Sequence, residues 1–114
     1  MPYFSIETNK KINSNNLNKL SKKALKFISK MLGKPEKWVM VSVKNNTPMI
    51  FGERDDFSAF IDLKSINLKK ENCPEYSIDI CDFVQNELRI LPENIYINYY
   101  NIDKKMFGWN KGVF

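Results

Sequence analysis

The feature of this sequence that most constrains its fold is a weak internal repeat with a period of 57 residues. Shifting the chain by this period places residues 3–8 on residues 60–65, and both segments have the composition and partial alternation of strands. The same shift places residues 35–40 on residues 92–97, and a Pro-Glu pair precedes the expected strand in both. The repeat therefore predicts two copies of one supersecondary unit.

A helix is expected between the two strands of each copy. In the first copy, Asn13 and Ser14 are candidate N-caps and Gly33 is a candidate C-terminal stop. Apolar residues recur between them at steps of three or four, which is typical of an amphipathic helix: Leu17, Leu20, Ala24, Phe27 and Met31. The second helix follows Pro74 and has its own apolar stripe: Ile80, Cys81, Val84 and Leu88. Because the shift aligns Ala24 with Cys81, we expect Cys81 to be a small core residue rather than a redox group.

Each strand-helix-strand copy has a crossover long enough to make its two strands parallel neighbours. Together the copies predict an α/β (α+β) fold, with a four-stranded mixed sheet and both helices on one face. We expect a single domain over residues 1–114, with pseudo-repeats at 2–44 and 57–100 and a C-terminal tail at 101–114. Strands such as 38–41 and 95–100 are apolar on both sides, so the uncovered face is expected to self-associate. The aromatic tail is expected to form a short strand or a lid on a neighbour.

The composition excludes several kinds of catalytic site. The chain has no histidine, so a Ser-His-Asp triad, a Cys-His pair and an imidazole metal ligand are impossible. Its two cysteines, Cys73 and Cys81, lack CxxC spacing and cannot form a four-thiolate zinc site. We therefore expect no metal site, acid-base chemistry by some other group, and a reducing compartment.

The sequence also limits the partners and the location. No run of about 18 apolar residues is present and the first residues do not resemble a secretory signal, which predicts no membrane span and a cytoplasmic protein. Lysines outnumber arginines sixteen to two, but the lysine pairs are dispersed among acidic residues without a nucleic-acid motif, so nucleic-acid binding is not expected. Pro2 is small enough that an aminopeptidase is expected to remove Met1 and leave the secondary amine of proline as the chain terminus.

Several short motifs occur in an order and spacing that resemble one family. They are Met1-Pro2, Gly33-Lys34-Pro35, Pro48-Met49, Phe51-Gly52, Lys64-Ser65-Ile66, the run IYINYY at 95–100, Gly108-Trp109-Asn110 and the closing Phe114. On these motifs the chain resembles the macrophage migration inhibitory factor family of the tautomerase superfamily along essentially its full length. The resemblance implies a homotrimer with its sheets around a central channel and active sites between subunits. It also implies keto-enol tautomerisation of phenylpyruvate-type aromatic 2-oxo acids, or of dopachrome derivatives, without a cofactor.

Pro2 is the catalytic residue that the resemblance implies. A free α-amino group titrates around 7.7 to 8.0, and burial beside a cation such as Lys34 would lower that pKa. The amine could then act as general base and general acid near neutral pH. The alternative is that Pro2 only begins a strand, where its missing N–H has no consequence.

The resemblance implies substrate-binding roles for eight further residues: Lys34, Ser65, Ile66, Tyr96, Asn98, Phe107, Trp109 and Phe114. Lys34 would hold the substrate carboxylate, Ser65 and the Ile66 N–H would line the wall, and Asn98 would come from the adjacent subunit. The aromatic residues would form the walls, with Tyr3 at the mouth. Each has a plainer interpretation: a cation at a helix C-terminus, the end of a strand, an outward-facing amide, or core and interface packing.

Two departures from the family pattern, together with the arginine content, limit the transfer of function. Residues 58–61 lack the CxxC of vertebrate members, and Phe107 is bulkier than the usual aliphatic residue at its position. The arginine pair that binds dicarboxylates in the related 4-oxalocrotonate tautomerases has no counterpart, because only Arg54 and Arg89 are present and Arg89 lies at the expected end of a helix, so a monoacid substrate is expected. A competing hypothesis is an interaction protein that engages a protein receptor while its pocket is vestigial. Release from cells without a signal peptide, as in some relatives, stays open beside the cytoplasmic location.

Overall fold

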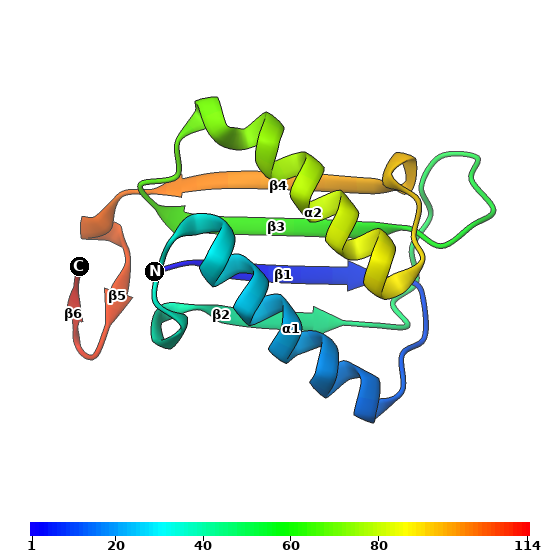
Figure 1. The fold of residues 1–114 in the computed structure, drawn as a ribbon, viewed down its shortest axis with the longest axis horizontal. Helices are drawn as coiled ribbons and strands as arrows, with labels where there is room; N and C mark the ends of the chain where they lie inside the picture. The colour runs from blue at the N-terminus through cyan, green and yellow to red at the C-terminus, as the bar shows by residue number, and fades with distance from the viewer.

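The computed structural model describes all 114 residues, 1–114, as two helices packed on one face of a sheet (Figure 1). The main elements are β1 (Tyr3–Thr8), α1 (Ser14–Leu32), β2 (Met40–Lys44), β3 (Ala59–Ile66), α2 (Cys73–Leu88), β4 (Ile95–Ile102), β5 (Gly108–Trp109) and β6 (Gly112–Val113). Four short 3-10 helices connect them: η1 (Glu36–Trp38), η2 (Lys70–Asn72), η3 (Pro92–Asn94) and η4 (Lys104–Met106).

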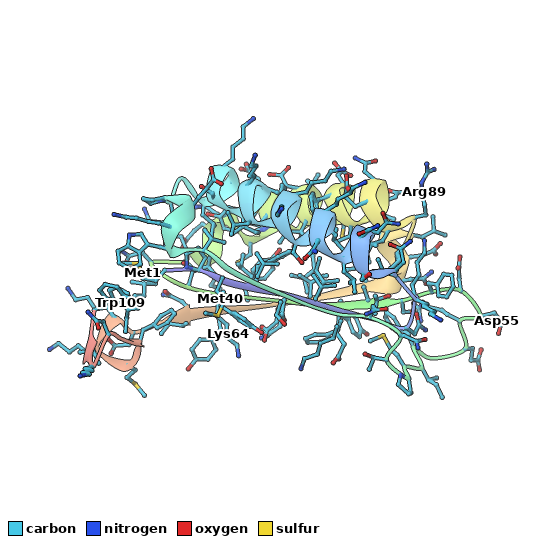
Figure 2. The ribbon with its side chains drawn as sticks, turned by 90° about the horizontal axis from the view of Figure 1, so that it is seen from below. Met1, Met40, Asp55, Lys64, Arg89 and Trp109 are labelled. Atoms are coloured by element: carbon cyan, nitrogen blue, oxygen red, sulfur yellow. The ribbon has the colours of Figure 1, made fainter.

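The sheet has the order β2-β1-β3-β4. Strand β1 is parallel to β2, β3 is parallel to β4, and the central pair β1 and β3 is antiparallel. Each half of the chain is thus one β-α-β unit, and the two units meet at the central pair. The predicted mixed sheet, with both helices on one face, is confirmed (Figure 2).

Helix α1 begins and ends where the sequence predicts. The Asn13 side chain accepts a hydrogen bond from the Asn16 N–H at the N-cap, and Gly33 ends the helix with a left-handed φ of 65°. Helix α2 has Pro74 in its first turn and ends at Arg89, which adopts φ 59°. The buried stripes are Leu20, Ala24 and Ile28 on α1, and Ile80, Val84 and Leu88 on α2. Phe27, Met31 and Cys81 are only partly buried and pack against this core.

The core lies between the helices and the inner face of the sheet. Alternate residues of the two central strands point into it, so Phe4, Ile6, Ile61 and Leu63 are fully buried. Each such side chain contributes about 1.5–3 kcal/mol of hydrophobic free energy.

The other face of the sheet is not covered by any element of the chain (Figure 2). Large side chains project from it, including Met40, Phe60, Tyr96 and Tyr100, which are 65%, 41%, 62% and 57% exposed. None of the helices is long and apolar enough to cross a membrane.

One expected boundary was wrong. Trp38 was expected in a strand, but it lies in the 3-10 helix η1 and β2 begins only at Met40. The second copy has the same arrangement, because η3 precedes β4. Each Pro-Glu pair therefore introduces a 3-10 turn ahead of the strand. The tail forms the β5-β6 hairpin, whose turn residues Asn110 and Lys111 both have positive φ, as a type I′ turn requires.

Candidate functional site

A cavity of about 430 Å³ lies at the end of the sheet where the chain begins. Its walls come from the first three residues, from the junction of η1 and β2, from the last residue of β4 and from the tail. Figure 2 shows Met1, Met40, Lys64 and Trp109, all of which line it, grouped at this end of the sheet, opposite Asp55 and Arg89.

Aromatic rings form most of the outer wall. The ring centroids of Trp38 and Trp109 are 4.8 Å apart in an edge-to-face arrangement, and Phe114 stacks on Trp109 at 6.0 Å. Phe114 also meets the edge of Phe107 at 5.7 Å, and its N–H donates to the Phe107 carbonyl at 3.2 Å. Such pairs add about 0.5–1.5 kcal/mol each beyond their buried area, so the tail is held as one wall of the cavity.

The α-amino group at the start of the chain is an unusually weak base. Burial, and second the charge of Lys34, lower the pKa of the Met1 α-amino group from 8.0 to about 6. Pro2, which follows it, is buried, and its carbonyl accepts a hydrogen bond from the Met40 N–H at 3.0 Å. The direction and both causes agree with the sequence-based expectation, although the titrating amine here belongs to Met1.

Lys34, Ser65 and Ile66 lie together next to the cavity but do not line it. The Lys34 ammonium donates to the Ser65 hydroxyl at 2.7 Å and to the Ile66 carbonyl. Burial lowers the Lys34 pKa. Two of its three N–H groups are therefore engaged with the end of β3, and its substrate-binding role stays a prediction.

Tyr96 and Asn98 do not reach this cavity within one chain. Tyr96 packs on Phe51, with ring centroids 4.4 Å apart, and the Asn98 amide donates to the Asp62 carboxylate at 2.9 Å. The register places Tyr96 level with Glu7, two strands away from β1 and offset from Tyr3 by four residues, or about 13 Å, along the strand direction. Their predicted contacts with substrate require a second copy of the chain.

The other predicted residues do meet at the cavity. Pro2, Phe107, Trp109 and Phe114 all line it, and so does Tyr3. The sequence analysis assigned no site role to several other lining residues, among them Lys37, Trp38, Met40 and Lys64. Two of these residues, Met40 and Lys64, follow from the strand pairing, because they lie opposite Tyr3 on the two neighbouring strands.

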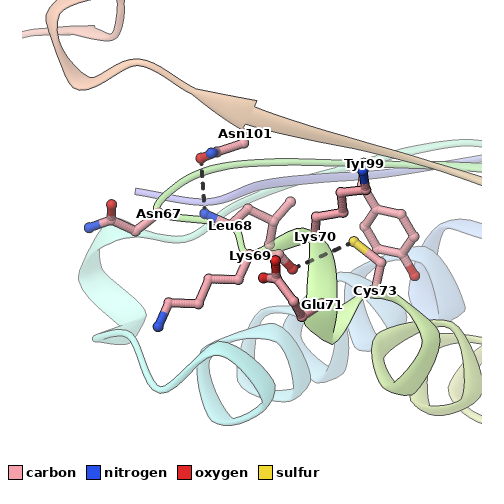
Figure 3. A pocket seen from close by; sticks show the side chains of 8 residues that line it. All are labelled: Asn67, Leu68, Lys69, Lys70, Glu71, Cys73, Tyr99 and Asn101. Carbon is pink, nitrogen blue, oxygen red and sulfur yellow. Dashed lines mark hydrogen bonds between the residues drawn. The ribbon is translucent and has the colours of Figure 1, made fainter.

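A second, larger hollow of about 540 Å³ lies between β4 and the start of α2 (Figure 3). Its polar groups serve the fold: Asn101 accepts from the Leu68 N–H at 3.0 Å, and the Cys73 thiol lies 3.8 Å from the Lys69 carbonyl. Tyr99 bonds to the Ser77 hydroxyl at 2.7 Å, and burial raises its pKa to about 12. The cavity at the chain start is therefore the candidate site.

Comparison with known proteins agrees with the fold and with the motifs. The family profile described as macrophage migration inhibitory factor matches residues 1–114. A macrophage migration inhibitory factor homologue from Brugia malayi is 33% identical over 118 residues, covering 100% of this chain and 99% of that protein. The macrophage migration inhibitory factor of Xenopus laevis is 31% identical over 120 residues, covering 100% and 99%.

Solved structures give the same result. The crystal structure of a macrophage migration inhibitory factor homologue from Prochlorococcus marinus superposes with a TM-score of 0.90 at 27% identity, covering 98% of both chains. A macrophage migration inhibitory factor-like protein from Entamoeba histolytica superposes with a TM-score of 0.89 at 26% identity, covering 99% of this chain and 98% of that one. The chain belongs to the macrophage migration inhibitory factor family and has its tautomerase-type fold.

Proposed function

We propose that this protein is a keto-enol tautomerase of phenylpyruvate-type aromatic 2-oxo acids, and that the Pro2 amine, exposed by removal of Met1, is its general base and acid. One observation carries the proposal: the chain begins inside an aromatic-walled cavity, where burial and, second, the charge of Lys34 lower the pKa of the Met1 α-amino group to about 6, and the Pro2 amine would lie one residue further along the same wall. An amine with that pKa is largely unprotonated at neutral pH, while its conjugate acid still returns a proton readily.

The reaction needs only one proton carrier. The Pro2 nitrogen takes a proton from the carbon between the aromatic ring and the carbonyl, and the electron pair of that C–H bond moves toward the carbonyl oxygen. The protonated amine then delivers the proton to that oxygen and the enol forms. The reverse sequence converts the enol to the ketone. Because the proton taken from carbon is delivered to oxygen of the same molecule and the amine ends unprotonated, as it began, the cycle consumes no co-reactant.

The cavity walls match the substrate class. The rings of Trp38, Trp109 and Phe114 offer faces and edges to a substrate phenyl ring, and Phe107 lines the same cavity. Lys34 places positive charge beside the terminal amine, where it disfavours protonation.

A complete site also requires assembly. The exposed aromatic face of the sheet supports a homotrimer in which Tyr96 and Asn98 of one subunit approach the cavity of the next. Light scattering should then give about three times the chain mass of 13.4 kDa. A monomer would contradict the proposal that Tyr96 and Asn98 approach the cavity of a neighbouring subunit.

The test compares phenylpyruvate tautomerisation by the wild type, by Pro2→Gly and by a form that retains an N-terminal extension before Pro2. Both changes should abolish most of the activity while the assembly mass stays the same. Pro48→Gly, in an exposed loop away from the cavity, is the matched control and should keep wild-type rates. Equal rates in all forms would refute the Pro2 mechanism. Trimers without any turnover, wild type included, would favour an interaction protein with a vestigial pocket.

A further inference from the structure

The outer face of helix α1 carries positive charge that the proposed function does not use. The helix contains no acidic residue and five lysines, all exposed: Lys19, Lys22, Lys23, Lys26 and Lys30. At about 100° per residue, these lysines fall within an arc of about 100° on the side opposite the buried stripe of the helix. They form one continuous row, called here the lysine stripe, which extends about 16 Å from Lys19 to Lys30.

Little of this charge is neutralised within the chain. Lys23 forms the only ion pair of the stripe, with Glu87 of α2 at 3.1 Å, and the other four lysines have no acidic partner. At the start of α1 the stripe borders a hollow of about 330 Å³, to which Lys10 and Lys11 add their charges. The first turn of the helix holds no acidic residue, so the positive end of the helix dipole adds to the same field. The surface therefore suits a partner with several negative charges along its length.

The neighbouring helix restricts the shape of that partner. Helix α2 contains no basic residue and four acidic ones: Glu75, Asp79, Asp82 and Glu87. Figure 1 shows α1 and α2 side by side across one face of the sheet, and the Lys23–Glu87 pair joins them. A flat anionic membrane or a wide DNA duplex that touched α1 would also approach the carboxylates of α2, and like charges repel. A narrow chain that lies along α1 alone avoids this repulsion.

The uncharged side chains of α1 restrict the chemistry of the partner. The one aromatic ring of the helix, Phe27, is stacked on Phe83 with centroids 4.5 Å apart, so it offers no platform for the bases of a single-stranded nucleic acid. Asn15 and Asn16 are exposed and extend the stripe toward the hollow. An amide both donates and accepts hydrogen bonds, and a sugar hydroxyl can use both, whereas inorganic polyphosphate offers only acceptors.

We propose that the lysine stripe binds a linear sulfated polysaccharide, with its sulfates on the lysines and its hydroxyls on Asn15 and Asn16. Release of the counterions that condense on such a chain drives the association. The stripe lies on the face opposite the one that the proposed trimer covers, so it stays accessible in the assembly (Figure 2). No residue of α1 lines the cavity at the chain start, so this binding is independent of the proposed tautomerase function.

The test measures the affinity of the assembled protein for a heparin octasaccharide by calorimetry over a series of salt concentrations. Lys19→Gln combined with Lys26→Gln should weaken binding about five- to tenfold near physiological salt. It should also lower the slope of log affinity against log salt by about two, because two lysine contacts are lost. Glutamine and lysine have similar helix propensities, so the thermal unfolding midpoint should stay unchanged.

Lys69→Gln combined with Lys70→Gln is the matched control. It removes the same charge from exposed positions beside the hollow between β4 and α2, and it should bind the octasaccharide as the wild type does. Unchanged affinity in the stripe variant would overturn the proposal. Equal losses in the two variants would also overturn it, because they would show an effect of net charge alone.

Four competing probes test the class of partner: the octasaccharide without its sulfates, inorganic polyphosphate of equal charge, oligothymidylate, and vesicles of equal parts phosphatidylserine and phosphatidylcholine. Each should bind more weakly than the sulfated octasaccharide. Equal or tighter binding of any of them would overturn the assignment to a sulfated polysaccharide. Absence of tautomerase turnover would refute the proposed function alone, because the calorimetric measurement does not depend on it.

Discussion

Replacing Lys34 by glutamine should shift the pH dependence of tautomerase activity to higher pH. Burial and Lys34 together lower the pKa of the Met1 α-amino group from 8.0 to about 6, and burial is the larger cause. Lys34 therefore accounts for less than half of the difference, so its removal should raise the pKa to about 7 at most. Pro2 lies one residue further into the same wall, and we expect its amine to experience the same two effects.

The size of the effect follows from the fraction of unprotonated amine. At pH 6 that fraction should fall from about one half to as little as one tenth, which lowers kcat/KM by up to about fivefold. At pH 8 the amine is unprotonated in both forms, so the rates should nearly coincide. The sign follows from the charges: removing a neighbouring cation stabilises the protonated amine, and protonation inactivates the base.

The assay is kcat/KM for phenylpyruvate from pH 5 to pH 9. Its interpretation is simple because the chain contains no histidine, so a transition near pH 6 cannot come from imidazole. Lys30→Gln is the matched control, because Lys30 is an exposed lysine in the last turn of the same helix. An unshifted midpoint in Lys34→Gln would refute the electrostatic argument. A loss by the same factor at every pH would instead assign Lys34 to substrate binding.

Three further predictions concern stability and can be measured together by urea unfolding. Leu63→Ala, at a fully buried position, should cost about 2–5 kcal/mol, whereas Ile78→Ala, at a position 62% exposed, should change stability by less than about 0.5 kcal/mol. Gly33→Ala should lower the free energy of unfolding and Arg89→Gly should raise it, by about 1 kcal/mol each, because both residues end a helix with left-handed φ. Changes of the same sign in the two variants would contradict this. Asn13→Ala should cost about 1 kcal/mol through loss of the N-cap, and an unchanged unfolding midpoint would show that the cap contributes nothing.

The fold was predictable from the sequence because both halves of the chain have the same strand-helix-strand pattern. Caps at Asn13 and Gly33 fix the first helix locally, and the shift of 57 residues transfers that assignment to the less regular second helix. The strand boundary at Trp38 was not predictable from pattern. Apolar residues are common to strands and to 3-10 turns, and only the hydrogen bond from the Trp38 N–H to the Pro35 carbonyl separates the two cases.

The site was predictable only in part, for a different reason. Pro2, Trp109 and Phe114 belong to recognisable motifs, so sequence reasoning found them. Lys37 belongs to no motif, and the motif that contains Lys64 gave it no role; their place in the cavity follows from strand register and from the turn η1. Their place in the cavity cannot be inferred before the strands are paired.

The repeat also explains why the chain has only one cavity that can hold a terminal amine. The second copy forms its own hollow, of about 270 Å³, in which Ala59 takes the place of Pro2 and Phe60 that of Tyr3. Glu7 takes the place of Lys64 there. No free amine can occur at Ala59, because the chain continues through it, and Glu7 would repel an anion.

Covalent connectivity therefore restricts proton transfer by a terminal amine to the first copy, however similar the two copies become. The second hollow must therefore have a different role, if it has one. Two of its side chains are among the most exposed large apolar groups of the chain, Ile50 at 91% and Tyr96 at 62%. Exposed apolar surface of this kind favours contact with another subunit. The two pseudo-symmetric ends of the sheet therefore differ: the first holds the cavity with the terminal amine, and the second presents exposed apolar side chains, Tyr96 among them.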